Sequence, residues 1–432
     1  MVWFYKFLYA HIVHLTDGIK KWFFYFRKKP RVTVVCWNLS HNPVGRAFLF
    51  ADSLKNDYQT ELVGPIFPKF GHKLWKPLRG YPLKVKSFTA GYLPDFYQQA
   101  VDFVEALDPA DIVIICKPRL PSMLIGLLLA QKNNAKVILD IDDHELSFFE
   151  NHTPISSDEL ATMPFSALER PFSEAWTRYC ESLIAQFPLR TVSNWTLQKK
   201  FGGTILPHVR NPVKFNRWLY NRNLVRRRYG IKRKDKVILF VGTPRAHKGF
   251  LEIPEAVKKL NDPRIKVMIV GKLRNKKLKD EIDLDRFPFL SFHPDVTFKK
   301  LPKILVMADL ICICQDPKSP VSKYQMPAKL SDAIMMGVPV IVRDVPPLKH
   351  LSRETGITQI SASDDLSKAI RKELKFGGFR DYYSKDLEYT NARRLIKDLI
   401  NKKSRHQTPN YYEDIIHRVK LMPVDTQLYE DL

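Results

Sequence analysis

Short apolar runs recur along the chain from residue 32, and each is followed by a polar loop and a segment with helical periodicity. Runs of about four to eight apolar residues bounded by turns are typical of buried strands in parallel sheets. An Asn- and Arg-rich segment without a strand pattern, 211–229, separates two groups of such runs. The runs occupy positions 32–37, 60–63, 111–116, 136–141, 236–241, 264–270, 289–293, 310–314 and 338–342. The pattern predicts two α/β series in one chain.

Two regions depart from this alternation. Segment 65–94 is rich in Pro, Gly, Lys and aromatic residues and is predicted to be an elaborated loop. Segment 148–190 is predicted to be mostly helical. Further helices are expected at 298–308, at 364–374 with Ser363 as the N-cap, and at 390–402.

The stretch 310–342 reads as strand, loop, helix and strand. The helix is expected to begin at Pro327 and to end at Gly337, because proline suits the first helical turn and glycine the position after the last. Lys329 lies in the first turn and adds a full positive charge to an end that already attracts anions, and Asp332 follows three residues later. A cation at the mouth and a carboxylate deeper in suit a nucleotide, with phosphates outside and ribose inside. The alternative is an ordinary crossover whose charged residues face solvent.

A second loop with cations opens the second α/β series. It follows the strand at 236–241 and reads Gly242-Thr243-Pro244-Arg245-Ala246-His247-Lys248-Gly249. Gly242 lets the backbone approach a ligand closely, and Arg245 and Lys248 supply positive charge. The spacing matches neither a Walker A loop nor a dinucleotide-binding fingerprint. Alone, the loop is a weak indication of a phosphate site.

The first series ends two of its strands in polar loops. The loop 41–46, with Gly45, leads into a helix. The strand at 136–141 runs into Asp140-Ile141-Asp142-Asp143-His144-Glu145, which offers a general base, a hydrogen-bonding histidine or metal ligands. A D-x-D motif after a strand is also the metal-binding signature of single-domain, metal-dependent glycosyltransferases. The alternative is a solvated turn.

The composition limits the kinds of molecule that the protein is expected to bind. The formal net charge of +25 indicates polyanionic partners, namely nucleic acid, an anionic membrane or phosphorylated small molecules. No zinc-finger spacing or RNA-recognition motif is present, so the sequence favours the other two over nucleic acid. The five cysteines lie mostly in apolar runs and indicate reduced thiols in a cytoplasmic protein, and no metal site is expected.

Residues 1–31 mix aromatic and basic residues without an uninterrupted apolar run of the ~18 residues that a spanning helix needs. They carry no small-residue cleavage site, so they do not read as a signal peptide. The segment predicts an amphipathic helix lying on an anionic membrane surface. The alternative is an extra helix packed on the first domain.

Together these motifs resemble a known group. Two α/β halves, the Gly-x5-Lys-Gly turn, Ala308-Asp309 before a strand and the Pro-x-Lys…Gly-x-Pro-Val stretch from Pro327 resemble GT-B glycosyltransferases, and among them the retaining glycosyltransferase family 4, or glycosyl transferases group 1. The resemblance implies two Rossmann-like domains facing each other across a cleft. It also implies a nucleotide-sugar co-substrate of UDP or GDP type on the C-terminal domain, an acceptor on the N-terminal domain, and no required cofactor or metal.

The resemblance also assigns residues. Lys248 matches the lysine that grips the donor diphosphate. The family has an arginine at the position of Thr243, and Arg245, two positions further on, is expected to substitute for it. The family's paired glutamates fall on Tyr324 and Asp332. The remaining expected donor contacts are Gly45, Gly242, Gly271, His293, Pro327 and Lys329, and the expected catalytic set is Lys248, Arg245, Asp143 and His144.

The expected domains are 1–31, 32–210 and 211–380, with a C-terminal helix and tail, 381–432, packing back toward the N-terminal domain. The expected function is transfer of a sugar, with retention, to a glycan or lipid-linked acceptor in bacterial surface polysaccharide assembly, such as lipopolysaccharide or capsule. The protein is expected in the cytoplasm, peripherally on the inner face of the cell membrane. A GT-B-like nucleotide-sugar epimerase and a non-catalytic basic adaptor for membrane or nucleic acid remain alternatives.

Overall fold

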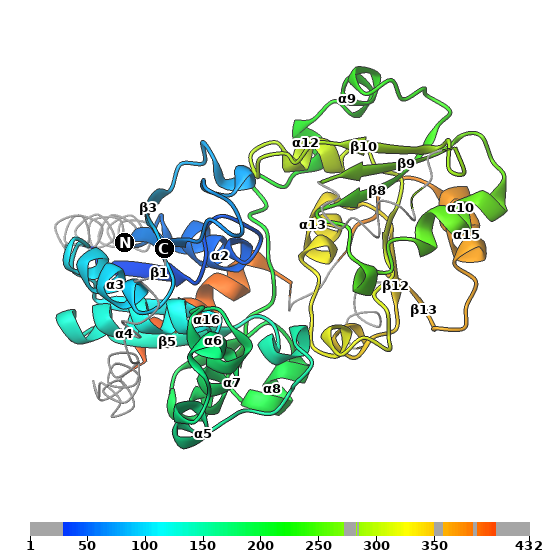
Figure 1. Ribbon diagram of the computed structural model, residues 1–432. Helices are drawn as coiled ribbons and strands as arrows, with labels where there is room; N and C mark the ends of the chain where they lie inside the picture. Colours follow the sequence, from blue (N-terminus) through cyan, green and yellow to red (C-terminus); the bar gives the residue numbers. More distant parts are fainter. Residues whose placement is uncertain (1–28, 272–281, 283–284, 350–356, 383–386, 403–432) are drawn as a thin grey trace, which may run out of the picture.

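The computed structural model describes residues 29–271, 282, 285–349, 357–382 and 387–402. Two α/β lobes face each other, with the chain crossing between them after residue 205 and again before α16 (Tyr389–Asn401) (Figure 1). The amphipathic N-terminal helix expected at 1–31 lies, except for its last three residues, outside the described residues, as does the tail from 403.

The first lobe is built on a seven-stranded parallel sheet in the order β3-β2-β1-β4-β5-β6-β7. The strands are β1 (Arg31–Cys36), β2 (Gln59–Ile66), β3 (Lys84–Thr89), β4 (Ile112–Cys116), β5 (Lys136–Ile141), β6 (Arg190–Val192) and β7 (Thr204–Ile205). The prediction of loop structure throughout 65–94 is wrong, because β3 pairs with β2 along the edge. Its alternating polar and half-buried residues lack the apolar run by which the inner strands were recognised.

Alternation along β1 shows how the sheet builds two cores. Val32 and Val34 lie in one apolar cluster with helix α2, whereas Val35 belongs to the other cluster with α3 and α4. A parallel sheet covered by helices on both faces requires this arrangement, because successive side chains point to opposite faces. The helices are α2 (Val44–Leu54), α3 (Asp95–Glu105), α4 (Leu120–Asn133), α5 (Ser157–Ala161), α6 (Phe165–Leu168), α7 (Glu174–Ser182) and α8 (Trp195–Phe201).

The second lobe contains two three-stranded parallel sheets, β10-β9-β8 and β11-β12-β13. A single bridge between Ile238 and Leu310 joins them edge to edge. The strands are β8 (Lys236–Val241), β9 (Ile265–Val270), β10 (Leu290–His293), β11 (Ile311–Ile313), β12 (Val340–Arg343) and β13 (Thr358–Ile360). The described helices are α9 (Arg222–Arg228), α10 (Glu252–Leu260), α12 (Leu301–Leu305), α13 (Ala328–Met336) and α15 (Leu366–Phe376).

Helix boundaries test the local predictions. Helix α13 is confirmed with Pro327 as its N-cap residue and Gly337 in the left-handed region at φ +67°. The helix expected at 298–308 is shorter, because only Leu301–Leu305 is α-helical. The N-cap of α15 is Asp365, whose side chain accepts from the Ser367 N–H, and not Ser363.

Helix α16 belongs to the first lobe although it follows the second in sequence. Tyr389, Ala392, Ile396 and Ile400 lie in the apolar cluster of β1 and α2. Lys136 on β5 donates to the Ile400 carbonyl and thereby ties the end of α16 to the sheet. We therefore propose domain boundaries near residues 210 and 380, with the C-terminal helix completing the first domain.

Candidate functional site

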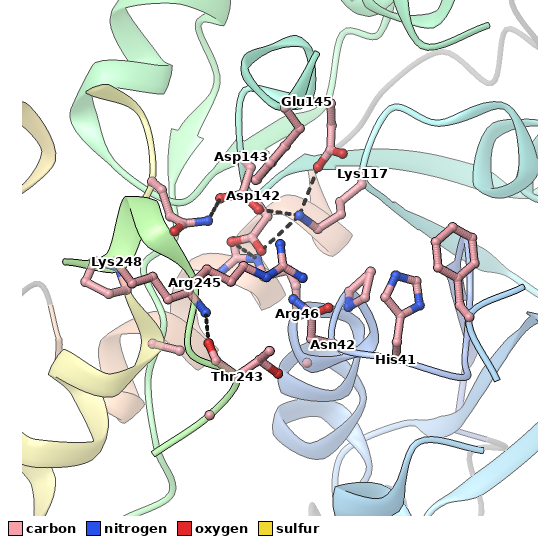
Figure 2. A pocket seen from close by; sticks show the side chains of 18 of the residues that line it. His41, Asn42, Arg46, Lys117, Asp142, Asp143, Glu145, Thr243, Arg245 and Lys248 are labelled. Carbon is pink, nitrogen blue, oxygen red and sulfur yellow. Dashed lines mark hydrogen bonds and ion pairs between the residues drawn. The ribbon is translucent and has the colours of Figure 1, made fainter. Parts of the chain in front are cut away.

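A cavity of about 1080 Å³ lies between the two lobes. Its walls are formed by loops that follow β1, β4 and β5 in the first lobe and β8 and β11 in the second. These are the carboxyl ends of parallel strands, where open α/β sheets bind their ligands. Figure 2 shows side chains from both lobes converging on it. The predicted site residues that line the cavity are Gly45, Asp143, Gly242, Thr243, Arg245, Lys248, Pro327, Lys329 and Asp332.

The loop after β8 packs so tightly that it needs glycine. Gly242 has φ +107°, and a Cβ on Gly271 would lie 2.3 Å from the Gly242 carbonyl oxygen. Lys248, in the short 3₁₀ turn Ala246–Lys248, donates to the Thr243 carbonyl at 3.2 Å and thus bends back over the loop (Figure 2). The loop therefore holds Lys248 against its own backbone at the cavity wall.

Three basic groups lie at this wall with little to offset their charge. Desolvation lowers the pKa of Lys248 to about 8, and repulsion from Arg245 contributes. Desolvation and repulsion from Lys248 lower the pKa of Lys329 well below its usual value, and desolvation together with Lys248 lowers that of His247 to about 4. Because burial and mutual repulsion destabilise the charged forms of these residues, a bound anion would stabilise them strongly.

Lys329 differs from its prediction. It lies in the first turn of α13, as expected, but its Nζ sits 3.1 Å from the centre of the Phe240 ring. The cavity shields it from water, which works against the full positive charge that the sequence suggested. The aromatic face compensates in part through a cation–π contact.

Asp332 also differs from its prediction. Instead of presenting a free carboxylate for a ribose, it pairs with Arg210, with 2.5 Å between Nε and Oδ1. Arg210 follows β7, so the pair joins the two lobes within the cavity wall. The sequence could not indicate this pairing, because a partner 122 positions away leaves no local pattern, and a contact between Asp332 and a ribose stays a prediction.

The first-lobe wall contains a fully buried ion pair. Arg46, in α2, donates from Nε and Nη2 to the two carboxylate oxygens of Asp140 at 2.9 and 2.8 Å, and Thr191 donates to the same carboxylate. Neither charged side chain is exposed to solvent. Arg46 lines the cavity, and its Nη1 is buried without a hydrogen-bond partner among the described residues. Such an unpartnered donor at a cavity suits a ligand oxygen.

Lys117 organises the acidic cluster after β5. It sits at the end of β4 with φ +70°, and its Nζ lies 2.5 Å from Asp143, 2.9 Å from Glu145 and 3.5 Å from Asp142 (Figure 2). A non-glycine residue in the left-handed region is strained, and such strain concentrates at functional sites. The cluster is therefore a buried, ion-paired network and not the solvated turn that was the alternative.

The three carboxylates differ in acidity. Burial and repulsion from Asp142 and Glu145 raise the pKa of Asp143, although Lys117 opposes this. Burial also acts on Glu145, but Lys117 and Arg119 outweigh it and lower that pKa. From the second lobe, Gln325 donates to Asp143 at 3.1 Å. Asp143, whose pKa is raised where that of Glu145 is lowered, is thus the better candidate of the two to exchange a proton.

His208 was missed by the sequence reading. It lines the cavity just after β7, and its Nε2 lies 2.9 Å from Asp142 Oδ1. Strand β7 is only two residues long and has no apolar run, so the sequence did not show that a strand ends just before His208. Arg210 escaped notice for the same reason.

Four predicted residues lie outside the cavity lining. His144 contacts Ser147 at 2.6 Å and Glu181 at 3.0 Å, and its ring packs against that of Tyr324, 4.7 Å between centroids. The Tyr324 carbonyl accepts from Asn194 of the first lobe. His144 and Tyr324 therefore hold the lobes together, and the prediction that they touch the donor is not supported by their placement.

Gly271 and His293 are the other two. The Gly271 N–H donates to the His293 carbonyl, and Gly271 packs against Gly242. The His293 ring lies against Tyr229, with 5.4 Å between centroids. Gly271 and His293 therefore support the loop after β8 on the side away from the cavity lining. The sequence indicated the correct edge of the sheet, where the strands end, but it could not show which side chains point into the cavity.

Within the described residues, no group of three or more His, Cys, Asp or Glu side chains could hold a metal ion. No helix among them is both long enough and apolar enough to span a bilayer.

Comparisons with known proteins agree on the fold. Residues 221–387 match the family model described as Glycosyl transferases group 1. A search of curated protein sequences found no match. The chain resembles the solved structure of HepE from Anabaena in complex with UDP and glucose, with 12% identity, 94% of this chain and 100% of that chain covered, and a TM-score of 0.57.

Two further structures are similar. One is a glycosyltransferase from Rickettsia africae, at 12% identity, covering 91% of this chain and 100% of that chain, with a TM-score of 0.56. The other is WaaG, a glycosyltransferase involved in lipopolysaccharide biosynthesis, at 13% identity, covering 89% and 99%, with a TM-score of 0.53. The chain thus has the two-lobed GT-B fold of these glycosyltransferase structures, and its residues 221–387 match the Glycosyl transferases group 1 family.

Proposed function

We propose that the cavity holds a nucleotide-sugar donor with its diphosphate against Lys248, Arg245 and Lys329, and transfers the sugar to a glycan or lipid-linked acceptor on the first-lobe wall. The observation that carries this proposal is the pair of lysines with lowered pKa values facing one cavity. The cost of keeping these cations out of water is recovered when a dianionic group arrives. HepE, which shares the fold, was solved with UDP and glucose.

The charge on these residues would act on the leaving group. As the bond between the anomeric carbon and the phosphate oxygen breaks, negative charge develops on the nucleoside diphosphate. Positioned cations stabilise that charge without reorganising, which is how preorganised electrostatic sites accelerate reactions. Lys248 would contribute most, because it is tethered to the loop backbone at Thr243 and faces the cavity.

We propose retention of anomeric configuration, with the acceptor oxygen attacking from the face that the phosphate leaves. The acceptor O–C bond forms as the C–O bond to phosphate breaks, and the acceptor proton passes to the departing phosphate oxygen. No protein nucleophile is needed. Asp143, with its raised pKa, would hydrogen-bond the acceptor hydroxyl and orient it.

The first-lobe wall has surfaces that suit a sugar acceptor. Trp37, Phe70 and Phe172 form a run of aromatic rings at the cavity, with 5.6 Å between the first two centroids and 5.0 Å between the last two. Arg119 lies 5.3 Å from the Trp37 ring centre. Flat aromatic faces beside charged hydrogen-bond donors fit a molecule with an apolar face and hydroxyl edges.

Donor affinity is expected to fall as the pH rises above 8. In the empty cavity Lys248 loses its proton near that pH, whereas a bound diphosphate favours the charged form, so binding at higher pH must take up a proton. The Kd for UDP should therefore rise by up to about tenfold per pH unit above 8. The ligand does not mask this effect, because a phosphate monoester has lost its second proton above about pH 6.

Calorimetry of UDP binding from pH 7 to 9, in two buffers of different ionisation enthalpy, measures both the affinity and the proton uptake. The Lys248→Met variant serves as control and should show a flatter profile. An affinity that stays constant over this range, with no proton uptake, would contradict the assignment of Lys248 to the diphosphate.

We also propose that the protein acts in bacterial surface polysaccharide assembly from the inner face of the membrane. The net charge of +25 and the aromatic, basic segment 1–31 support this location. WaaG, which has a similar fold, is involved in lipopolysaccharide biosynthesis. Deleting residues 1–28 should move the protein from the membrane fraction toward the soluble fraction of a cell lysate. An unchanged distribution would exclude this segment as an anchor.

A further inference from the structure

The segment 211–234 carries a surface that neither the cavity nor the fold explains. Among the described residues, six large hydrophobic side chains are exposed, and four of them lie within it: Val213, Trp218, Leu219 and Leu224. Trp218 is 81% exposed and Val213 76%. Isolated exposed apolar residues are common, but their concentration in twelve positions marks an interaction surface.

The charge of the same segment has one sign. It contains no Asp or Glu and nine basic residues: Lys214, Arg217, Arg222, Arg226, Arg227, Arg228, Lys232, Arg233 and Lys234. The first four pair with acidic residues elsewhere. The last five are exposed, and no ion pair joins any of them to another described residue.

Local structure brings the two kinds of side chain together. In α9, Leu224, Arg227 and Arg228 are spaced three and four apart and share one exposed face. Trp218 and Leu219 lie in the 3₁₀ turn Arg217–Leu219, which two extended residues separate from α9, and the Arg217 guanidinium is 4.9 Å from the Trp218 ring centre. Figure 1 shows α9 at the outer edge of the second lobe, apart from its other helices.

We infer that this surface, the α9 surface (211–234), docks on an anionic lipid bilayer. Exposed Trp and Leu enter the interfacial layer while Arg and Lys meet acidic headgroups, which is the combination that interfacial binding requires. A single-stranded nucleic acid would also use the cations and Trp218, but it gives no reason to expose Val213, Leu219 and Leu224. The inference adds a second contact, on the described fold, to the membrane location proposed above.

The position of the surface gives it a role. Arg210 lines the cavity, and its guanidinium lies 5.6 Å from the ring of Phe215, inside the same segment. Phe215 is buried in the core of the second lobe, so the segment that carries the α9 surface is joined to the cavity wall through a packed residue. Docking this surface on a bilayer would keep the cavity near a lipid-linked acceptor.

Vesicle co-sedimentation of the full-length protein tests this inference. The probe is vesicles with about one-third phosphatidylglycerol in phosphatidylcholine, and the variants are Trp218→Ser/Leu219→Ser/Leu224→Ser and Arg227→Gln/Arg228→Gln/Lys232→Gln. Each should lower the partition coefficient by about tenfold or more, because each removes three contributions to interfacial binding. Matched controls in the same lobe are Phe376→Ser, at an apolar residue 70% exposed, and Lys368→Gln/Arg371→Gln/Lys372→Gln on the exposed face of α15.

Controls that bind like the wild type, with both α9 variants weakened, support the inference. Variants that bind as well as their controls overturn it, as does single-stranded RNA that displaces the wild type from vesicles. UDP binding measured without vesicles should be the same in all of these proteins. If UDP binding is absent throughout while the vesicle results hold, the proposed enzymatic function fails and the α9 surface stands.

Discussion

Replacing Lys248 with Met is expected to lower the rate of sugar transfer by about 10²–10³-fold without lowering the melting temperature. The loss of rate follows from removing one preorganised cation that faces the leaving diphosphate. Stability should hold or rise, because the folded chain keeps Lys248 at a pKa of about 8, below its ordinary 10.5. The unfolded chain thus binds the proton more tightly, and the charge costs stability fully below pH 8 and not at all above about 10.5.

Opposite effects on rate and stability distinguish a functional lysine from a structural one. The matched control is Lys318→Met, an exposed lysine of the same lobe outside the cavity lining, which should change neither quantity. Rates come from a coupled assay of nucleoside diphosphate release, and stability from thermal unfolding at pH 7. A Lys248→Met enzyme that retains most of its activity would remove Lys248 from the mechanism.

Replacing Asp140 with Ala is expected to cost about 3–5 kcal/mol in the free energy of unfolding of the first lobe. The Arg46–Asp140 pair has no exposed side-chain surface, so the variant leaves a buried guanidinium without its carboxylate. Thr191 loses its acceptor as well. The exposed control Glu150→Ala should stay within about 0.5 kcal/mol. Chemical denaturation followed by circular dichroism provides the measurement.

A double variant separates packing from function at this pair. Arg46→Met/Asp140→Leu replaces both charges by apolar groups, which can recover much of the lost stability. Sugar transfer should not recover with it, because Arg46 presents its unpartnered Nη1 at the cavity. A loss below about 1 kcal/mol for Asp140→Ala would show that the buried Arg46–Asp140 pair contributes little to the stability of the first lobe.

Local sequence patterns were sufficient to predict those strands and helix ends whose structure depends on residues close together in the sequence. The apolar run at 32–37 became β1 and the proline and glycine around α13 became its caps, because burial and backbone geometry act at the position itself. The same patterns missed β3, an edge strand whose residues alternate between exposed and half-buried. Its polar composition suits the edge of a sheet, where unpaired backbone must not attract another chain.

The site was predictable to the level of loops but not of side chains. The sequence singled out the polar loops after β1, β5 and β8, which line one cavity, and it anticipated Lys248 and Asp143 there. It could not show that Arg210 would form an ion pair with Asp332, or that His144 would pack against Tyr324. Those contacts join residues more than a hundred positions apart and depend on how the two lobes meet.

The central claim is that the cavity holds a nucleotide-sugar donor by its diphosphate. The most direct measurement is thermal unfolding of the wild type and of Lys248→Met over a panel of UDP, GDP, CMP and ADP sugars. One diphosphate class should raise the melting temperature of the wild type, since a ligand that binds only the folded state stabilises it. The variant should lose most of that rise. A panel that shifts neither protein, or that shifts both equally, would show that the cavity does not hold a donor by its diphosphate.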